Sequence, residues 1–344
     1  MTPKVFVFRN ALDIFICQSP KSDTKMLSVL IIGVLITVLI ITSSPGTAFG
    51  DSVIAVTPVG EFPQALEFNP SNNNIYVANR DSGIVSVIDG TANKVVKNIT
   101  VGGSPESLKF NPSNNYTYLA NSISNNISVI DGSTNTVADG VKVGSNPVAL
   151  EFNPFNNNTY VANAISNTVS VIDSSTNMVI NDADVETSPV ALEFNPSNNN
   201  IYVANRDSGT VSVIDSTNDT VFRNINVENS PVALEFNPSN NNIYVANRDS
   251  GTVSVIASSN NTLLENVVAG TEPVALEFNP SNNNIYVANV VSNSVSVIHR
   301  ANNTVAETVD VGSVPLALIF NPTNDGIYVA GTLTGTDGLV SVIG

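Results

Sequence analysis

The chain has 344 residues, of which 29 are acidic and 13 are basic, so its formal net charge is −16. This charge would repel a phosphate backbone, which excludes nucleic acid as a partner. The only cysteine is Cys17 and the only histidine is His299. The region after residue 50 therefore has no disulfide framework, no thiolate nucleophile, no cysteine-based metal site and no multi-histidine haem or copper site.

The N-terminal region reads as a targeting segment. Residues 26–41 are sixteen residues without a charge, preceded by Lys21 and Lys25 and followed by small residues that end in Ala48-Phe49-Gly50. A basic flank, an apolar run and a small-residue cleavage site predict a signal peptide over residues 1–50. The alternative is an uncleaved anchor, because residues 26–44 are 19 residues long and could span a bilayer.

Both alternatives predict the same location for the rest of the chain. The positive flank stays inside, so residues 51–344 are expected outside the cell or at its surface. We expect contact with a membrane only through the N-terminal segment, and only if it is not cleaved.

After residue 50 the sequence repeats with a period of 42, since Phe-Asn-Pro recurs with its Phe at 68, 110, 152, 194, 236, 278 and 320. Each copy has four apolar runs rich in Val, Ile, Tyr and Thr, separated by Asn, Asp, Ser, Gly and Pro. Such runs predict β-strands joined by turns, and no helical period is present. In the fourth copy the expected strands are Val190–Phe194, Ile201–Ala204, Thr210–Ile214 and Thr220–Val227.

Four short antiparallel strands per repeat predict one blade of a β-propeller, so the fold class is an all-β, seven-bladed propeller over residues 51–344. The seventh copy stops at residues 341–344, after its third strand. The missing fourth strand is expected at the other end of the domain, where residues 53–60 align with residues 305–312 of copy six. We predict that a strand at about 52–59 completes the last blade and closes the ring.

The repeated motifs resemble a known family. Tyr-Val-Ala-Asn, then S-N-T-V-S-V-I-D, T-N-x-V and V-G-x-x-P-x-A-L, are similar to the YVTN-family β-propeller repeat of archaeal surface-layer and other secreted proteins. The resemblance covers residues 51–344, with Ala in place of Thr in each motif. It implies the propeller fold and an exterior location, and it implies a function only in general terms.

The sequence gives little support for catalysis. A catalytic propeller needs different groups converging from different blades, whereas these copies are nearly alike. His299 stands where other copies have Asp89, Asp131, Asp173 and Asp215, so we interpret it as a turn residue. No catalytic residue and no cofactor are predicted.

The alternative function is a metal-dependent lactonase-like hydrolase, because seven-bladed lactonases resemble these propellers. A glutamate recurs on the first strand just before Phe-Asn-Pro, and first strands are innermost in a propeller. The alternative therefore predicts a ring of carboxylates at the central channel that holds a divalent cation such as Ca²⁺. Lys109 and Ile319 interrupt this ring, and each carboxylate could instead be held by backbone amides, water or Lys109. The candidate ligands are Glu67, Glu151, Glu193, Glu235 and Glu277.

Because strands alternate in direction, first and third turns should share one face of the ring, the first-turn face. Second and fourth turns should share the opposite face, the second-turn face. Most N-x-[ST] sequons fall on the first-turn face, where glycans would make it solubilising. The seven candidate glycosylation sites are Asn98, Asn115, Asn126, Asn157, Asn218, Asn260 and Asn302.

The second-turn face varies between blades and carries the candidate ligand-binding residues. Three of its turns begin with an Arg-Asp pair, which could recognise carboxylate, sulfate or sugar groups. The competing interpretation is that each Arg pairs with its own Asp. The candidates are Arg80, Arg206, Arg248, Asp81, Asp207 and Asp249.

Taken together, the sequence predicts an acidic, exported or cell-surface glycoprotein whose propeller is a non-catalytic binding or scaffold module. The expected partner is a protein or glycan of the cell envelope, and the propeller itself is expected to be monomeric.

Overall fold

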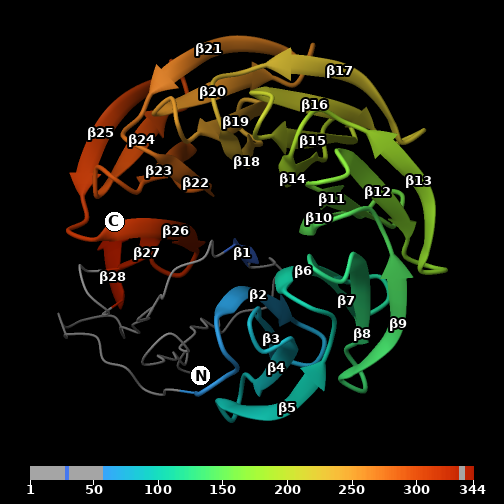
Figure 1. Cartoon of the computed structure of the whole chain (residues 1–344). Coiled ribbons are helices and arrows are strands. Elements are labelled where there is room, and N and C mark those ends of the chain that lie inside the picture. The colour runs from blue at the N-terminus through green and yellow to red at the C-terminus, as the bar shows by residue number, and fades with distance from the viewer. Residues whose placement is uncertain (1–27, 31–56, 333–337) are drawn as a thin grey trace.

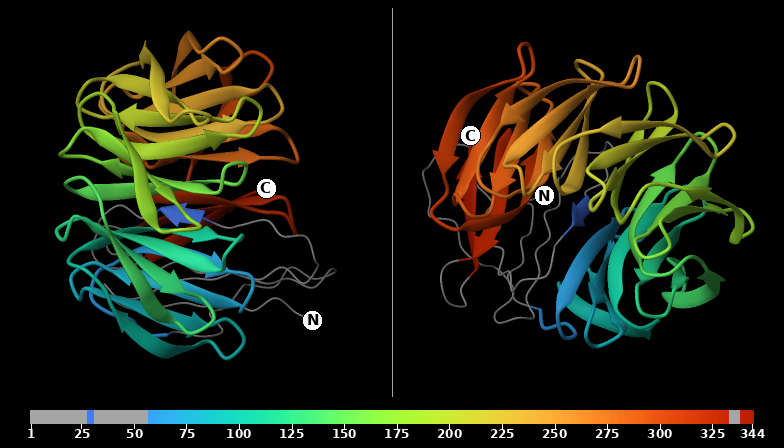
Figure 2. Two further views of the ribbon diagram at one scale, coloured as in Figure 1. Left: turned by 90° about the vertical axis from the view of Figure 1, so that its right-hand side faces the viewer. Right: turned by 45° about the horizontal axis from the view of Figure 1, so that its top comes forward.

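The computed structural model describes residues 28–30, 57–332 and 338–344. Within these ranges the regular structure consists of strands alone, arranged in seven antiparallel sheets around a common centre (Figure 1). Figure 2 shows the same sheets from the side and tilted, with the blades arranged as successive layers of strands. The predicted seven-bladed propeller is therefore confirmed. No helix in the described ranges is long and apolar enough to cross a membrane.

The first two strands of each blade recur with nearly constant length. The first strands are β2 (Pro63–Asn69), β6 (Pro105–Asn111), β10 (Pro147–Asn153), β14 (Pro189–Asn195), β18 (Pro231–Asn237), β22 (Pro273–Asn279) and β26 (Val314–Asn321). The second strands are β3 (Asn74–Asn79), β7 (Tyr116–Asn121), β11 (Asn158–Asn163), β15 (Asn200–Asn205), β19 (Asn242–Asn247), β23 (Asn284–Asn289) and β27 (Gly326–Thr332).

The outer two strands follow the same repeat. The third strands are β4 (Ile84–Asp89), β8 (Asn126–Asp131), β12 (Thr168–Asp173), β16 (Thr210–Asp215), β20 (Thr252–Ala257), β24 (Ser294–His299) and β28 (Gly338–Ile343). The fourth strands are β5 (Lys94–Thr100), β9 (Thr136–Lys142), β13 (Met178–Asp184), β17 (Thr220–Asn226), β21 (Thr262–Val268) and β25 (Thr304–Asp310). In the fourth blade the observed bounds agree with the predicted ones to within one residue.

The turns depend on residues that tolerate a left-handed backbone. Second turns end in Gly83, Gly209 and Gly251 in three blades and in asparagine in three others, all with φ between 52° and 67°. Glycine and asparagine adopt this conformation at the lowest cost. The two turn sequences, Arg-Asp-Ser-Gly and x-x-Ser-Asn, are thus two solutions to one backbone requirement.

Two faces arise as expected, because backbone hydrogen bonds join the turns in pairs. The N–H of Gly90 in a third turn donates to the carbonyl of Asn73 in the first turn. On the opposite face, the N–H groups of Arg80 and Asp81 donate to carbonyls of the segment before β2, which is the fourth-turn position. First and third turns therefore share one face of the ring, and second and fourth turns share the other, as predicted.

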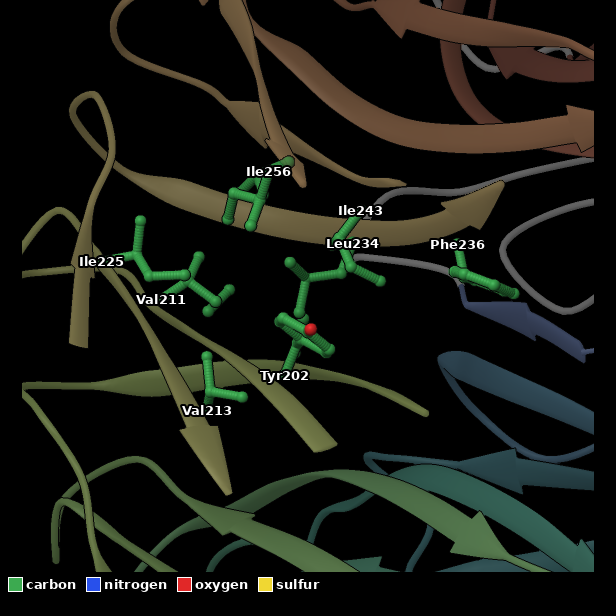
Figure 3. Close-up of a cluster of buried hydrophobic side chains, with 11 residues drawn as sticks. Tyr202, Val211, Val213, Ile225, Leu234, Phe236, Ile243 and Ile256 are labelled. Carbon is green, nitrogen blue, oxygen red and sulfur yellow. The ribbon is translucent and has the colours of Figure 1, made fainter. Parts of the chain in front are cut away.

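The hydrophobic core lies between the blades. Every residue of β15 is buried, and so is every residue of β16 except Asp215, because both faces of these strands pack against neighbouring sheets. One cluster joins Tyr202 and Val213 of blade four to Leu234 and Ile243 of blade five (Figure 3). Burial of each such aliphatic side chain contributes roughly 1.5–3 kcal/mol.

Blade seven also packs against blade one. Ala317 and Ala330 of blade seven share a buried cluster with Leu66, Ile75 and Val77 of blade one. In the seventh sheet, three strands lie within the described ranges, in the order β26-β27-β28.

The closing strand predicted at about 52–59 lies mostly outside the described residues. Thr57–Val59, the part that is described, are not in a strand. The hydroxyl of Thr57 donates to the carbonyl of Asn93, in the third turn of blade one, at 2.7 Å. Thr57 therefore lies beside blade one, and the closing strand stays a prediction.

One short strand precedes the ring. Residues Ser28–Leu30 form β1, which pairs antiparallel with β2 so that Ser28 lies opposite Glu67. This strand falls within the segment predicted as a signal peptide, and the rest of that segment lies outside the described residues. The pairing places an extended segment along the inner edge of blade one.

Candidate functional site

The predicted carboxylates occupy the innermost strands. Contacts between successive first strands run around the ring, from β2 to β6 and on to β22 and β26, so these strands surround its centre. We call Glu67, Glu151, Glu193, Glu235 and Glu277 the inner carboxylates. Glu67 is the most buried of them, with 1% of its surface exposed.

Most inner carboxylates are held by the next blade. The backbone N–H of Phe110 donates to Glu67 Oε1 at 2.9 Å, and the N–H of Phe320 donates to Glu277 Oε1 at 2.9 Å. The N–H of Phe278 donates to Glu235 Oε1 at 3.3 Å. These glutamates thus link successive first strands, as the competing interpretation of the sequence predicts.

Lys109 fills the gap in the glutamate series and neutralises part of the charge. Its Nζ lies 2.7 Å from Glu151 Oε2, and both side chains are 14% exposed. Burial lowers the pKa of Lys109, but attraction to Glu151 and Glu67 outweighs burial, so the pKa is raised overall. Lys109 therefore remains a cation beside the carboxylates.

Burial raises the pKa of four inner carboxylates, Glu67, Glu193, Glu235 and Glu277. It raises the pKa of Glu67 to about 8, although Lys109 and the Phe110 N–H oppose the shift. Burial, and then repulsion by Glu151, raise the pKa of Glu193 to about 8. The pKa of Glu277 rises to about 7 through burial, and that of Glu235 rises well above its usual value through burial and repulsion by Glu193 and Glu277. Several of these groups are consequently protonated at neutral pH.

The geometry does not gather these carboxylates around a cation. Among the described residues, no group of three or more His, Cys, Asp or Glu side chains lies close enough to hold a metal ion. Their oxygens are directed to backbone N–H groups and to Lys109 instead. The described residues therefore do not assemble a site for the Ca²⁺ of the alternative hypothesis.

His299 is the last residue of β24, where the third turn of blade six begins, and it is exposed. Its Nδ1 accepts the N–H of Ala301 at 3.3 Å. In blade four the equivalent Asp215 accepts the N–H of Thr217 at 2.9 Å. The histidine thus stands in for a turn-capping aspartate, which is the role interpreted from the sequence.

The Arg-Asp pairs of the second-turn face are local. Arg80, Arg206 and Arg248 each donate Nε to the next residue, Asp81, Asp207 and Asp249, at 3.2, 2.8 and 3.2 Å. The guanidinium of Arg80 also stacks 3.8 Å from the ring centre of Phe62. Blade one is separated from blades four and five, so the fold brings Arg206 and Arg248 to neighbouring blades and leaves Arg80 apart.

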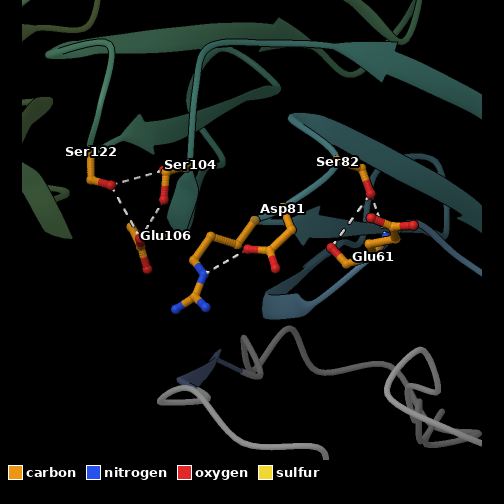
Figure 4. A network of polar contacts seen from close by, with 7 residues as sticks. Glu61, Asp81, Ser82, Ser104, Glu106 and Ser122 are labelled. Atoms are coloured by element: carbon orange, nitrogen blue, oxygen red, sulfur yellow. Dashed lines mark hydrogen bonds and ion pairs between the residues drawn. The ribbon is translucent and has the colours of Figure 1, made fainter.

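The same turns carry exposed apolar tips in the other blades. The position of Asp81 is taken by Ile123 in blade two, Ile165 in blade three and Val291 in blade six, which are 76%, 71% and 56% exposed. Figure 4 shows polar contacts of the second-turn face in blades one and two, where Glu106 accepts hydrogen bonds from Ser104 and Ser122. Sequence reasoning recorded these turns as variable but missed the exposed aliphatic residues.

A family profile described as "Lactonase, 7-bladed beta-propeller" matches residues 131–269 and 215–320. Together these matches cover more than half of the chain. The chain belongs to this lactonase family of propellers. The YVTN assignment, by contrast, stays a prediction.

Solved structures similar to this lactonase-family propeller show the fold alone, because their identities are low. Hydrazine synthase of Kuenenia stuttgartiensis is 18% identical with a TM-score of 0.62, over 80% of this chain and 93% of that one. The dihydro-haem d1 dehydrogenase NirN is 14% identical with a TM-score of 0.72, over 94% of this chain and 72% of that one. No curated protein matches significantly.

A repeated polar contact of this lactonase-family ring joins neighbouring blades. The hydroxyl of Tyr202 in β15 donates to Asn261 Oδ1 at 2.5 Å, across to the third turn of the next blade. Four more tyrosines do the same at 2.5–2.8 Å; they are Tyr76 to Asn135, Tyr118 to Asn177, Tyr160 to Asp219 and Tyr244 to Asn303. We call this contact the interblade latch. The tyrosine and the turn asparagine both repeat visibly in the sequence, but their pairing does not.

Proposed function

We propose that the chain is an exported propeller that binds a protein or glycan of the cell envelope through its second-turn face and performs no chemistry of its own. The repeated polar residues support this proposal, because they make structural contacts within the ring. Tyrosines form interblade latches, His299 caps a turn, and inner carboxylates hold the next blade. What varies from blade to blade is the second turn.

The observation that carries the proposal is the exposure of Ile123 and Ile165. They occupy the same turn position in neighbouring blades, where blades one, four and five have aspartate. A partner that covers both turn tips would remove these two aliphatic side chains from water, which favours binding. The Arg-Asp turns of the other blades would form a polar rim around this apolar centre, as interfaces commonly have.

The N-terminal segment supports the exterior location. Its apolar run and basic flank are those of an export signal, and the absence of cysteine after residue 50 suits an oxidising exterior. Membrane contact would remain only where residues 26–44 are not removed.

The test compares two faces of the same purified propeller. Ile123→Asp combined with Ile165→Asp copies the aspartate of blades one, four and five, and the control Phe155→Ser copies the serine that other blades have in their first turn. Binding to isolated envelopes of the source cells is measured by sedimentation over a concentration series. We expect the double variant to lose at least about tenfold in affinity, since each buried aliphatic contact contributes about 1–2 kcal/mol, and the control to bind normally.

Equal binding of the double variant and the wild type would show that this face is not the binding surface. Loss of binding in the control as well would point to the first-turn face or to misfolding. Circular dichroism of all three proteins separates these two cases.

A second candidate function follows from the family and from the inner carboxylates. Carboxyl groups with a pKa of about 7 to 8, as for Glu277 and Glu193, suit general acid–base catalysis near neutral pH. Hydrolysis of small γ- and δ-lactones, followed by acid release, tests this candidate. If the wild type hydrolyses a lactone and Glu193→Gln combined with Glu235→Gln abolishes this activity, the chain is a hydrolase and not only a binding module.

A further inference from the structure

The fold separates the sequons into two kinds according to what their residues contact. A sequon consists of an asparagine and a hydroxyl residue two positions later, and both must be reached before a glycan is attached. The seven candidates are equivalent in sequence. In the folded chain they are not.

Three sequons have a buried hydroxyl residue. Thr117 and Thr159 are fully buried, and Ser128 is 4% exposed. The asparagines at the head of the first two, Asn115 and Asn157, also accept hydrogen bonds from asparagines of the preceding blade, at 2.7 and 3.3 Å. A folded chain therefore cannot present these sequons or that of Asn126.

A fourth sequon is exposed but lies in a regular strand. Asn98 pairs with Ser86 in the ladder between β4 and β5, and its Oδ1 accepts the Ser86 hydroxyl at 2.9 Å. An enzyme that binds the sequon in its own groove would have to pull this segment away from the sheet.

The other three sequons share one place in the repeat. Asn218, Asn260 and Asn302 are exposed in the third turns of blades four, five and six, and the fourth strand begins at the sequon threonine. In each of them the asparagine Oδ1 accepts the threonine hydroxyl, at 2.6, 2.8 and 2.9 Å. Within the described part of the chain no hydrogen bond engages the Nδ2 atoms, which are the atoms that carry a glycan.

The interblade latch fixes these turns in place. The middle residue of each sequon is the latch acceptor, Asp219, Asn261 or Asn303, bound by the tyrosine of the preceding blade. The neighbouring asparagine is thereby held at the surface of the first-turn face.

We propose that Asn218, Asn260 and Asn302 are N-glycosylation sites, and that the folded ring withholds the other four sequons. The donor is an oligosaccharide linked to a lipid diphosphate. The bond between sugar C1 and the diphosphate oxygen breaks, a bond from C1 to Nδ2 forms, and one amide proton is released as the lipid diphosphate leaves. In the cell this rests on the proposed export, and it would cover the first-turn face of blades four to six while leaving the second-turn face open.

The test uses the folded full chain, purified without glycans and incubated with a single-subunit oligosaccharyltransferase and a lipid diphosphate oligosaccharide. Peptide mass spectrometry measures occupancy at each asparagine. Proteolytic peptides that contain the same sequons serve as the unfolded control. We expect all seven to be modified in the peptides and, in the folded chain, the three turn sites to be modified at least about tenfold more than the others.

The chain also offers a gain-of-site control. Thr134 is the blade-two counterpart of Asn218, and its Oγ1 lies 2.8 Å from Thr136 Oγ1, in the same local hydrogen bond. Thr134→Asn creates a new sequon in an exposed turn, and we expect it to be modified like the other three.

Two results would overturn the proposal. One is occupancy of Asn115 or Asn157 in the folded chain equal to that of Asn218. The other is absence of modification at the three turn sites when the matching peptides react. Neither result depends on export or on partner binding, so failure here is distinct from failure of the proposed function.

Discussion

Glu67 should make the propeller less stable as the pH rises, and Glu67→Gln should remove much of that dependence. The side chain is 1% exposed, its Oε1 accepts the Phe110 N–H at 2.9 Å, and its Oε2 has no partner among the described residues. Burial raises its pKa to about 8. Glutamine keeps the shape and the acceptor for Phe110 but carries no charge at any pH.

The direction follows from proton linkage. A carboxyl whose pKa is higher in the folded than in the unfolded chain stabilises the fold at low pH, and this contribution is lost as the pH rises from 4.5 to about 8. The difference between these two pKa values corresponds to roughly 5 kcal/mol at high pH. Water entry and relaxation around the charge reduce this figure, so we expect a measured difference of about 2–5 kcal/mol.

Urea denaturation of the full chain at pH 5, 7 and 9 measures the effect. The Glu67→Gln protein should have a flatter stability profile than the wild type, with the largest gain at pH 9. Glu307→Gln, on the exposed strand β25, is the control and should follow the wild type. Parallel profiles for Glu67→Gln and the wild type would show that Glu67 does not titrate as a buried acid.

A chain that starts at residue 51 gives a second comparison. It lacks β1, whose Ser28 lies opposite Glu67 in the ladder. If this pairing contributes to the burial of Glu67, the shorter chain should lose less stability at high pH.

Three further predictions concern contacts that repeat around the ring. Tyr202→Phe removes an interblade latch and leaves a buried acceptor unpaired. It should lower the free energy of unfolding, measured in urea, by about 1–3 kcal/mol. The control is Tyr286→Phe, whose hydroxyl donates to no described residue, and it should lower the free energy of unfolding by less. His299→Asp should restore the turn cap of the other blades and raise the unfolding free energy by about 0.5–1 kcal/mol, and a loss of stability would contradict the capping role. Gly102→Ala would place a Cβ 2.6 Å from a buried asparagine side chain and should lower the free energy of unfolding by about 1–3 kcal/mol, measured by heat or urea. In the control Gly140→Ala the new Cβ meets nothing within 4 Å, so stability should not change. Equal effects of the two variants would refute the packing argument.

Prediction from the sequence succeeded where a contact is local. The position of each strand follows from runs of β-branched residues between turn formers, so Thr210–Ile214 was found as β16 almost to the residue. The role of His299 was also readable, because the copies place aspartate at the same turn position. A 42-residue period with four strands leaves few folds other than a propeller.

The contacts of the site could not be predicted from the sequence, because they join residues of different blades. Tyr202 and its latch partner lie 59 residues apart in the chain, and Glu67 and the Phe110 N–H lie 43 residues apart. The repeat identifies the recurring residues but not the residues that they contact in another blade. These contacts depend on how the blades pack in the ring.

The sequence by itself therefore determined the strands, the turns and the number of blades, because hydrophobic period and turn chemistry act over a few residues. Only the tertiary structure decided which polar groups face another blade and which face water. The packing of the blades determines the raised pKa of Glu67, the exposure of Ile123 and the accessibility of Asn218. The 42-residue pattern alone does not distinguish these residues from those at the same repeat position in other blades. The physical reason is that burial and charge pairing depend on the packing of neighbouring blades, whereas the repeat pattern describes each blade alone.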